Sequence, residues 1–167
     1  MRSIESIRGR KRKTNGSMFE NLLIASANRN DWQFLRIPDG CKQLAYNRII
    51  RIKSPFDFVF INKSQKHILF CDAKTTDEGT FPPGKIKEHQ IKDLSKFDGL
   101  QNSKTGYIVN FDKESKVVFF NINQLKSSLI SRKGLKAEDG IAIGHRFNIQ
   151  FNKIFTDSPQ IIEQSKL

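Results

Sequence analysis

Two pairs of short hydrophobic segments dominate the pattern along the chain. Residues 56–62 (Phe-Asp-Phe-Val-Phe-Ile-Asn) and 67–74 (His-Ile-Leu-Phe-Cys-Asp-Ala-Lys) have the composition of strands. The polar linker between them, residues 63–66, is short enough to predict a β-hairpin. A second hairpin is predicted from residues 106–111 and 116–122. These strands would supply the centre of a sheet.

Helical spacing of apolar residues appears on both sides of these hairpins. It predicts helices at residues 18–29, 85–98 and 123–131. In the second of these helices Ile86, Leu94 and Phe97 lie on one side. One more strand is predicted before the hairpins, at residues 32–37. This order of helix, strands, helix and strands predicts an α/β domain with a mixed β-sheet flanked by helices.

The remaining segments divide the chain into three parts. Residues 1–17 are basic and lack apolar periodicity, which predicts a flexible arm. The core domain would span residues 18–131 and contain a basic, extended segment at 41–54. Residues 132–167 are weakly patterned and are expected to form a C-terminal extension.

The charge of the chain points to a polyanionic partner. Its 167 residues carry a net charge of +12, and much of the positive charge is clustered, so nucleic acid is the first candidate. The two cysteines, Cys41 and Cys71, have no partner at a spacing typical of a zinc site or a disulfide framework. A reducing, cytoplasmic setting is expected, and no apolar run is long enough to span a membrane.

Candidate chemistry lies in the first hairpin. If Asn62 pairs with His67, the register places Asp57 directly opposite Asp72, where Cβ atoms are about 5 Å apart. Two carboxylates at this distance repel unless a cation lies between them, and a divalent ion with oxygen ligands such as Mg²⁺ fits. Lys74 falls on the same strand face as Asp72 because side chains alternate along a strand.

Gln90 is a further candidate. It falls in the middle of the apolar face of the predicted helix at 85–98, where an inward amide needs hydrogen-bond partners. A water, a scissile phosphate or a backbone carbonyl would each satisfy it.

The motifs at these positions resemble a known family. Pro55-Phe56-Asp57 followed by Asp72-Ala73-Lys74 resembles the PD-(D/E)-x-K nuclease signature. Within that superfamily, several further pieces are similar to the RecU-type Holliday junction resolvases of Gram-positive bacteria and their phages. They are Phe70–Thr76, Thr80-Phe81-Pro82, His89-Gln90 with Leu94, and Asn15-Gly16 with Phe19-Glu20. The resemblance covers roughly residues 14–122, and the combined spacing is far more specific than the acid-x-Lys piece alone.

The resemblance implies a restriction-endonuclease-like core and a homodimer that cuts two strands of a four-way DNA junction, using Mg²⁺ or Mn²⁺. Asp57 and Asp72 would bind the metal, Lys74 would assist the attacking water, and Glu20 and Gln90 would complete the site. It also implies a stalk at residues 41–54. The residues expected to hold DNA are Arg8, Arg10, Lys11, Arg12 and Lys13 of the arm and Lys42, Arg48, Arg51 and Lys53 of the stalk. Asp72 departs from the family, which usually has glutamate there.

The expected setting is the cytoplasm of a bacterium, as a bacterial protein or a phage protein in a bacterial host, with recombination or branch-migration proteins as further partners. Three alternatives remain open. They are a restriction-type or other duplex DNA endonuclease on the same fold, a non-catalytic junction-binding protein, and an RNA-binding protein. The intact acid pair with its lysine argues against a non-catalytic protein, and no RNA-recognition motif is present.

Overall fold

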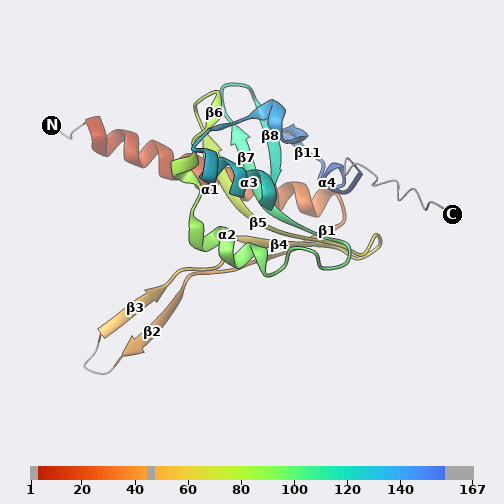
Figure 1. Ribbon diagram of the computed structural model, residues 1–167, viewed down its shortest axis with the longest axis horizontal. Coiled ribbons are helices and arrows are strands. Elements are labelled where there is room, and N and C mark those ends of the chain that lie inside the picture. Colours follow the sequence, from red (N-terminus) through yellow and green to blue (C-terminus); the bar gives the residue numbers. More distant parts are fainter. Residues whose placement is uncertain (1–3, 45–47, 157–167) are drawn as a thin grey trace.

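A seven-stranded mixed sheet forms the body of the computed structural model, which describes residues 4–44 and 48–156 (Figure 1). The strand order is β1 (Trp32–Arg36), β4 (Phe58–Asn62), β5 (His67–Thr76), β7 (Ser103–Phe111), β8 (Lys116–Asn121), β10 (Ile141–His145) and β11 (Asn148–Ile149). β5 and β7 pair in parallel, and the other neighbours in this sheet pair antiparallel. The predicted mixed α/β architecture is confirmed.

The hairpin of β4 and β5 has the register that the sequence predicted. Asn62 pairs with His67, and the ladder runs back to Phe58 opposite Cys71. The Asn62 side chain stabilises the turn, since its Oδ1 atom accepts hydrogen bonds from Ser64 Oγ at 2.8 Å and from the backbone N–H of Gln65 at 3.0 Å. β5 continues beyond this ladder to Thr76, so its second half has no partner in β4.

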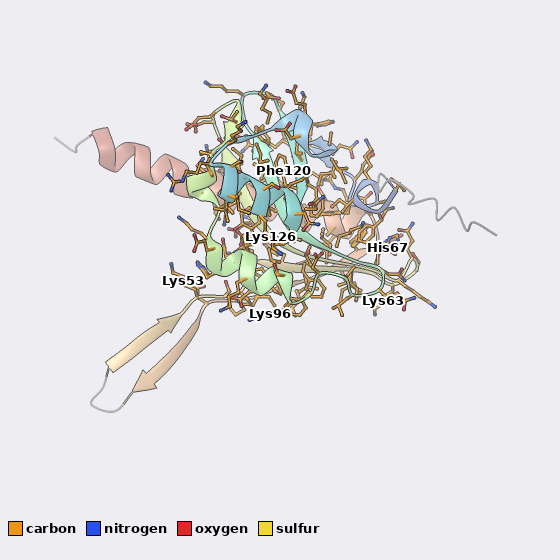
Figure 2. All side chains as sticks on the ribbon, viewed as in Figure 1. Lys53, Lys63, His67, Lys96, Phe120 and Lys126 are labelled. Atoms are coloured by element: carbon orange, nitrogen blue, oxygen red, sulfur yellow. The ribbon has the colours of Figure 1, made fainter. Side chains whose placement is uncertain are left out.

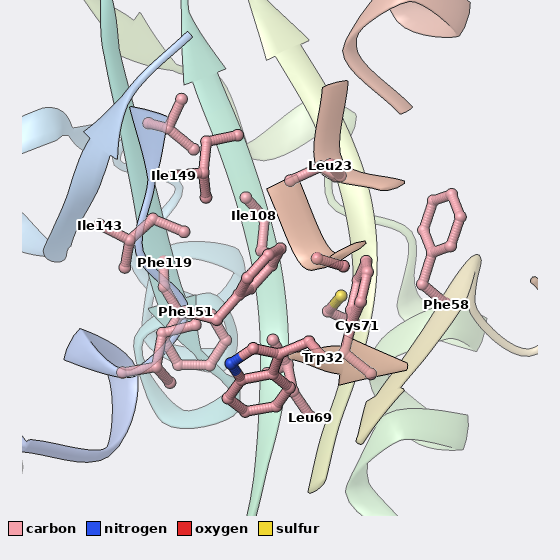
Figure 3. Packing of buried hydrophobic residues seen from close by; sticks show 14 of the residues in the cluster. Leu23, Trp32, Phe58, Leu69, Cys71, Ile108, Phe119, Ile143, Ile149 and Phe151 are labelled. Carbon is pink, nitrogen blue, oxygen red and sulfur yellow. The ribbon is translucent and has the colours of Figure 1, made fainter. Parts of the chain in front are cut away.

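Helix α1 (Ile4–Arg29) covers one face of the sheet. Its buried residues Phe19, Leu23 and Ala27 belong to a core cluster with residues from the strands. Figure 3 shows Leu23, Cys71 and Trp32 in this cluster, together with Phe151 and Ile108. This face of the sheet is apolar, as the composition of the strands requires.

Three shorter elements cover the opposite face: η1 (Pro83–Lys85), α2 (Glu88–Ser95) and α3 (Ile122–Ser131). Ile91 and Leu94 of α2 pack in a second core cluster that includes Tyr107 of β7. α3 begins at a capping box, because the Asn121 side chain accepts from the N–H of Gln124 while the Gln124 side chain bonds the N–H of Asn121.

The N-terminal prediction was wrong in its secondary structure. α1 begins at Ile4, so Ser17, which was expected to cap a helix beginning at residue 18, lies inside the helix. The arm carries no apolar stripe, and the rule that assigns helices from apolar periodicity therefore misses it. The predicted helix at 85–98 is also divided, into η1 and the shorter α2.

Two small sheets lie outside the main one. β2 (Gly40–Leu44) and β3 (Arg48–Ile52) pair antiparallel and extend away from the body in Figure 1. They occupy the region where a stalk was expected. β6 (Thr80–Phe81) pairs with β9 (Leu135–Lys136).

The weakly patterned C-terminal segment contributes to the main core. It forms η2 (Ala137–Asp139), β10, β11 and α4 (Lys153–Thr156), and Ile143, Ile149, Phe151 and Ile154 are fully buried. The sequence did not predict these elements because they are short and because the pairing of β10 with β8 shifts register between Ala142 and Gly144. Among the described residues, no helix is long and apolar enough to span a membrane.

Candidate active site

The candidate site lies just before the start of β4, where β5 continues beyond its pairing with β4. Asp57 immediately precedes β4, and its Oδ2 atom accepts a hydrogen bond of 2.9 Å from the backbone N–H of Ala73. The carboxylate therefore satisfies the backbone N–H of Ala73, which has no partner in β4 because the ladder stops at Cys71. Its own carbonyl accepts from the N–H of Ile37 at 2.9 Å, which ties the backbone of Asp57 to the end of β1.

Asp72 lies beside Asp57 and is fully buried. The pKa of Asp72 is raised to about 8: burial is the main cause, the ammonium of Lys74 lowers it, and the Asp57 carboxylate raises it. Lys74 Nζ forms an ion pair with Asp72 Oδ2. Strand parity accounts for this contact, because the two side chains leave β5 on the same face.

Gln90 of α2 reaches the same carboxylate from above the sheet. Its Nε2 atom donates to Asp72 Oδ1 at 2.9 Å, and its Oε1 atom accepts from the Tyr107 hydroxyl at 2.9 Å. Tyr107 stands opposite Asp72 in the parallel register of β5 and β7. Lys74 Nζ lies 5.3 Å from the centre of the Tyr107 ring, within the range of a cation–π contact.

Glu20 approaches the site from α1. It forms an ion pair of 2.5 Å with Arg36 of β1, at the edge of the sheet. Partial burial raises the pKa of Glu20, Arg36 lowers it, and the charges of Asp57 and Lys74 act on it in opposite directions. Glu20 is therefore within electrostatic reach of Asp57 and Lys74.

The fold thus brings together the candidates that the sequence proposed. Asp57, Asp72, Lys74 and Gln90 form one connected cluster, and Glu20 borders it. Their catalytic roles remain predictions. The sequence analysis did not identify Tyr107. The clue was its position in an apolar strand, because a tyrosine buried there needs a hydrogen-bond partner for its hydroxyl.

The structure describes little of the predicted DNA-binding side chains. The side chains of Arg8, Arg10, Lys11, Arg12, Lys13, Lys42, Arg48 and Arg51 lie outside the part of the chain whose side chains are described. Lys53 is described and exposed, and Figure 2 shows it where the β2–β3 hairpin joins the body. The DNA contacts of the arm and the hairpin remain predictions.

The cluster offers oxygen ligands for a divalent cation. Asp72 Oδ2 is buried and meets Lys74 but has no hydrogen-bond donor in suitable geometry among the described residues. Within the same part of the chain, no group of three His, Cys, Asp or Glu residues converges as a complete metal cage. Mg²⁺ does not require such a cage, since it is commonly held by one or two carboxylates with water and substrate phosphate. The donor set of Asp57 and Asp72 fits this coordination.

Comparison with known proteins gives one family match that covers most of the chain. The family model described as recombination protein U (RecU) matches residues 18–162. No curated protein matches. The solved structures similar to this chain include Hjc from Archaeoglobus fulgidus, a Holliday junction resolvase from an archaeal hyperthermophile. It is 17% identical, with a TM-score of 0.47, over 65% of this chain and 78% of Hjc. Another is SSO0001, at 14% identity and a TM-score of 0.34, over 81% of this chain and 64% of that one.

The family match includes β4, β5, α2 and β7, and therefore the whole cluster around Asp72. It also extends through β10 and β11, beyond the stretch that the motifs alone indicated. The chain belongs to the recombination protein U family of Holliday junction resolvases.

Proposed function

We propose that the protein is a structure-selective endonuclease that resolves four-way DNA junctions by metal-dependent hydrolysis of two symmetric strands. Family membership supports the substrate class. The observation that carries the chemistry is the buried Asp72 between Asp57 and Lys74. A buried carboxylate is costly unless a cation or hydrogen bonds compensate for it. This site has both, since the Lys74 ammonium and the Gln90 amide contact Asp72, and its two acids offer oxygen ligands to a divalent cation.

In this proposal Asp57 and Asp72 hold Mg²⁺, for which Mn²⁺ would substitute. When bound, the metal would supply Lewis-acid stabilisation of the charge that develops on the phosphate. Lys74 would orient the attacking water and stabilise the same charge, because its ammonium lies beside Asp72 Oδ2. Gln90 would hold the Asp72 carboxylate, and Glu20 would contribute negative charge at the edge of the site.

The substrate requires more than one catalytic centre. A four-way junction is resolved by cuts in two equivalent strands, and a homodimer would present two copies of this site. The basic arm and the β2–β3 hairpin, which carry the nine candidate DNA-binding residues, would hold the junction arms through their phosphates. We place this activity in the bacterial cytoplasm, in the cell's own recombination or in that of an infecting phage, alongside recombination or branch-migration proteins.

The experiment compares a synthetic four-way junction with a linear duplex of matching sequence, each incubated with the protein and Mg²⁺. The proposal predicts paired nicks in two opposite strands of the junction and little cutting of the duplex. Comparable cleavage of the duplex at fixed sequences would indicate a duplex endonuclease instead. Tight junction binding with no cleavage in either Mg²⁺ or Mn²⁺ would indicate a non-catalytic binding protein.

A further inference from the structure

A chain of hydrogen bonds leads from the start of α2 to the buried carboxylate. The backbone N–H of Lys87, at the N-cap of α2, donates to the Tyr107 hydroxyl at 3.3 Å. That hydroxyl donates to Gln90 Oε1 at 2.9 Å, and Gln90 Nε2 donates to Asp72 Oδ1 at 2.9 Å. Tyr107 and Asp72 are fully buried, and Gln90 is 9% exposed, so solvent competes little with these bonds.

The chemistry of each group fixes which partner donates in every one of these hydrogen bonds. A backbone N–H can only donate, so the Tyr107 oxygen accepts from Lys87 and its proton is directed to Gln90. Gln90 must then present its carbonyl oxygen to Tyr107 and its NH₂ group to Asp72. Without the hydroxyl, the Gln90 carbonyl oxygen would lose its buried donor, and only the bond to Asp72 would hold the amide in this orientation.

The two oxygens of Asp72 are consequently not equivalent. Oδ1 is occupied by the Gln90 amide, whereas Oδ2 faces the Lys74 ammonium in a close ion pair. A divalent cation held by the pair of acids would therefore bind Oδ2, and the Lys74 ammonium would have to share or leave that oxygen.

We propose that Tyr107 is a positioning residue: its hydroxyl fixes the orientation of the Gln90 amide, which occupies Asp72 Oδ1 and leaves Oδ2 for the catalytic cation. This inference rests on the proposed function and adds a residue to it. Tyr107 acts through Gln90 and does not touch the cation itself. Groups that orient a metal ligand in this way commonly change metal affinity by about 10- to 100-fold when they are removed.

The hydroxyl can be separated from the ring by substitution. Tyr107→Phe removes the proton donor but keeps the ring that packs in the core and lies under Lys74. Thr105→Val is a matched control, because Thr105 is buried two residues earlier on β7 and its hydroxyl donates to Asp98 instead, at 3.0 Å. Both variants delete one hydroxyl from the same strand.

The first measurement is Mn²⁺ binding to the full chain without DNA, detected by electron paramagnetic resonance. Tyr107→Phe is expected to bind Mn²⁺ about 10- to 100-fold more weakly than wild type. Thr105→Val is expected to bind as wild type does. Equal affinity in Tyr107→Phe and wild type would overturn the proposal.

A double-mutant cycle tests the route through the amide. Gln90→Met removes the intermediate group and is expected to weaken Mn²⁺ binding by a similar factor. Adding Tyr107→Phe to Gln90→Met should then change affinity by less than about twofold, because the hydroxyl has lost the group through which it acts. Additive losses, or a Gln90→Met variant that binds Mn²⁺ normally, would contradict the proposal even if Tyr107→Phe were to fold poorly.

Junction cleavage separates this inference from the function on which it rests. If wild type cleaves junctions and Tyr107→Phe has both normal Mn²⁺ affinity and normal cleavage, the positioning role fails and the proposed function stands. If wild type neither binds Mn²⁺ nor cleaves, the proposed function fails and takes the positioning role with it.

Discussion

The two faces of the β5–β7 strand pair both pack against apolar clusters, but only one of them also buries a polar cluster. On the face covered by α1, Cys71 and Ile108 are fully buried in an apolar cluster. On the other face, Asp72 and Tyr107 are equally buried but joined by hydrogen bonds through Gln90. Neighbouring residues in the sequence thus experience different environments. The comparison shows that burial alone does not mark the site; buried polar groups with few, directed partners do.

A large effect is expected from removing the Lys74 ammonium on the face that carries Asp72. Lys74→Met deletes the ammonium that pairs with Asp72. Loss of this stabilising charge should reduce single-turnover junction cleavage by on the order of 10³-fold. Lys85→Met is a control that removes a nearby lysine whose Nζ donates to the Thr75 carbonyl instead. Cleavage within a fewfold of wild type in Lys74→Met would mean that the polar cluster is structural.

The face covered by α1 should respond in stability and not in metal binding. Ile108→Ala truncates a fully buried side chain and should lower the free energy of unfolding by about 3 kcal/mol, because it removes packing and leaves a cavity. Denaturant unfolding checks the loss, and Mn²⁺ affinity of the folded variant should be unchanged. A large drop in Mn²⁺ affinity would erase the distinction between the two faces.

The pH dependence of stability is a third way to test the comparison. In the metal-free folded protein the pKa of Asp72 is raised to about 8, whereas in the unfolded chain it has its ordinary value of 3.8. Between these two pH values the folded protein keeps a proton on Asp72 that the unfolded chain has released. Stability should therefore fall as pH rises toward 8, and then level off. Between pH 6.5 and 8.5 the expected loss is on the order of 2 kcal/mol. Denaturant unfolding in the presence of a chelator would measure it, and Asp72→Asn should lack it.

The smallest effect is expected at the border of the site. Arg36 pairs with Glu20, but its side chain is 59% exposed, so solvent screens the interaction. Arg36→Gln should change the free energy of unfolding by less than about 1 kcal/mol. Thermal unfolding at two salt concentrations checks this. A loss of several kcal/mol that salt does not reduce would show that the pair is a structural anchor.

Local pattern predicted the parts of this protein that local contacts determine. The strand-like composition of residues 56–62 and 67–74 predicted β4 and β5, and the short polar linker between them predicted their register. That register placed Asp57 beside Asp72, and helical spacing placed Gln90 on the inward face of α2. These inferences needed only one hairpin and one helix.

The parts that the sequence did not reveal depend on distant contacts. Tyr107 meets Asp72 because β7 pairs in parallel with β5. Parallel pairing needs a crossover connection, which here includes α2, and no local sequence pattern predicts it. The final strands, β10 and β11, are too short and irregular to show periodicity, although Ile143 and Ile149 are fully buried. In α1, residues 4–17 have no apolar stripe, and the helix there was not predicted.

The measurement that tests the central claim most directly is single-turnover cleavage of a four-way junction by Asp72→Asn in Mg²⁺. It should be compared with Asp93→Asn, which neutralises an acid on α2 paired with Lys96 at the surface. If Asp72 is a metal ligand, Asp72→Asn should bind the junction about as tightly as wild type but show no detectable cleavage, while Asp93→Asn cleaves normally. Cleavage by Asp72→Asn at a rate close to that of wild type would contradict the assignment of this cluster as the active site.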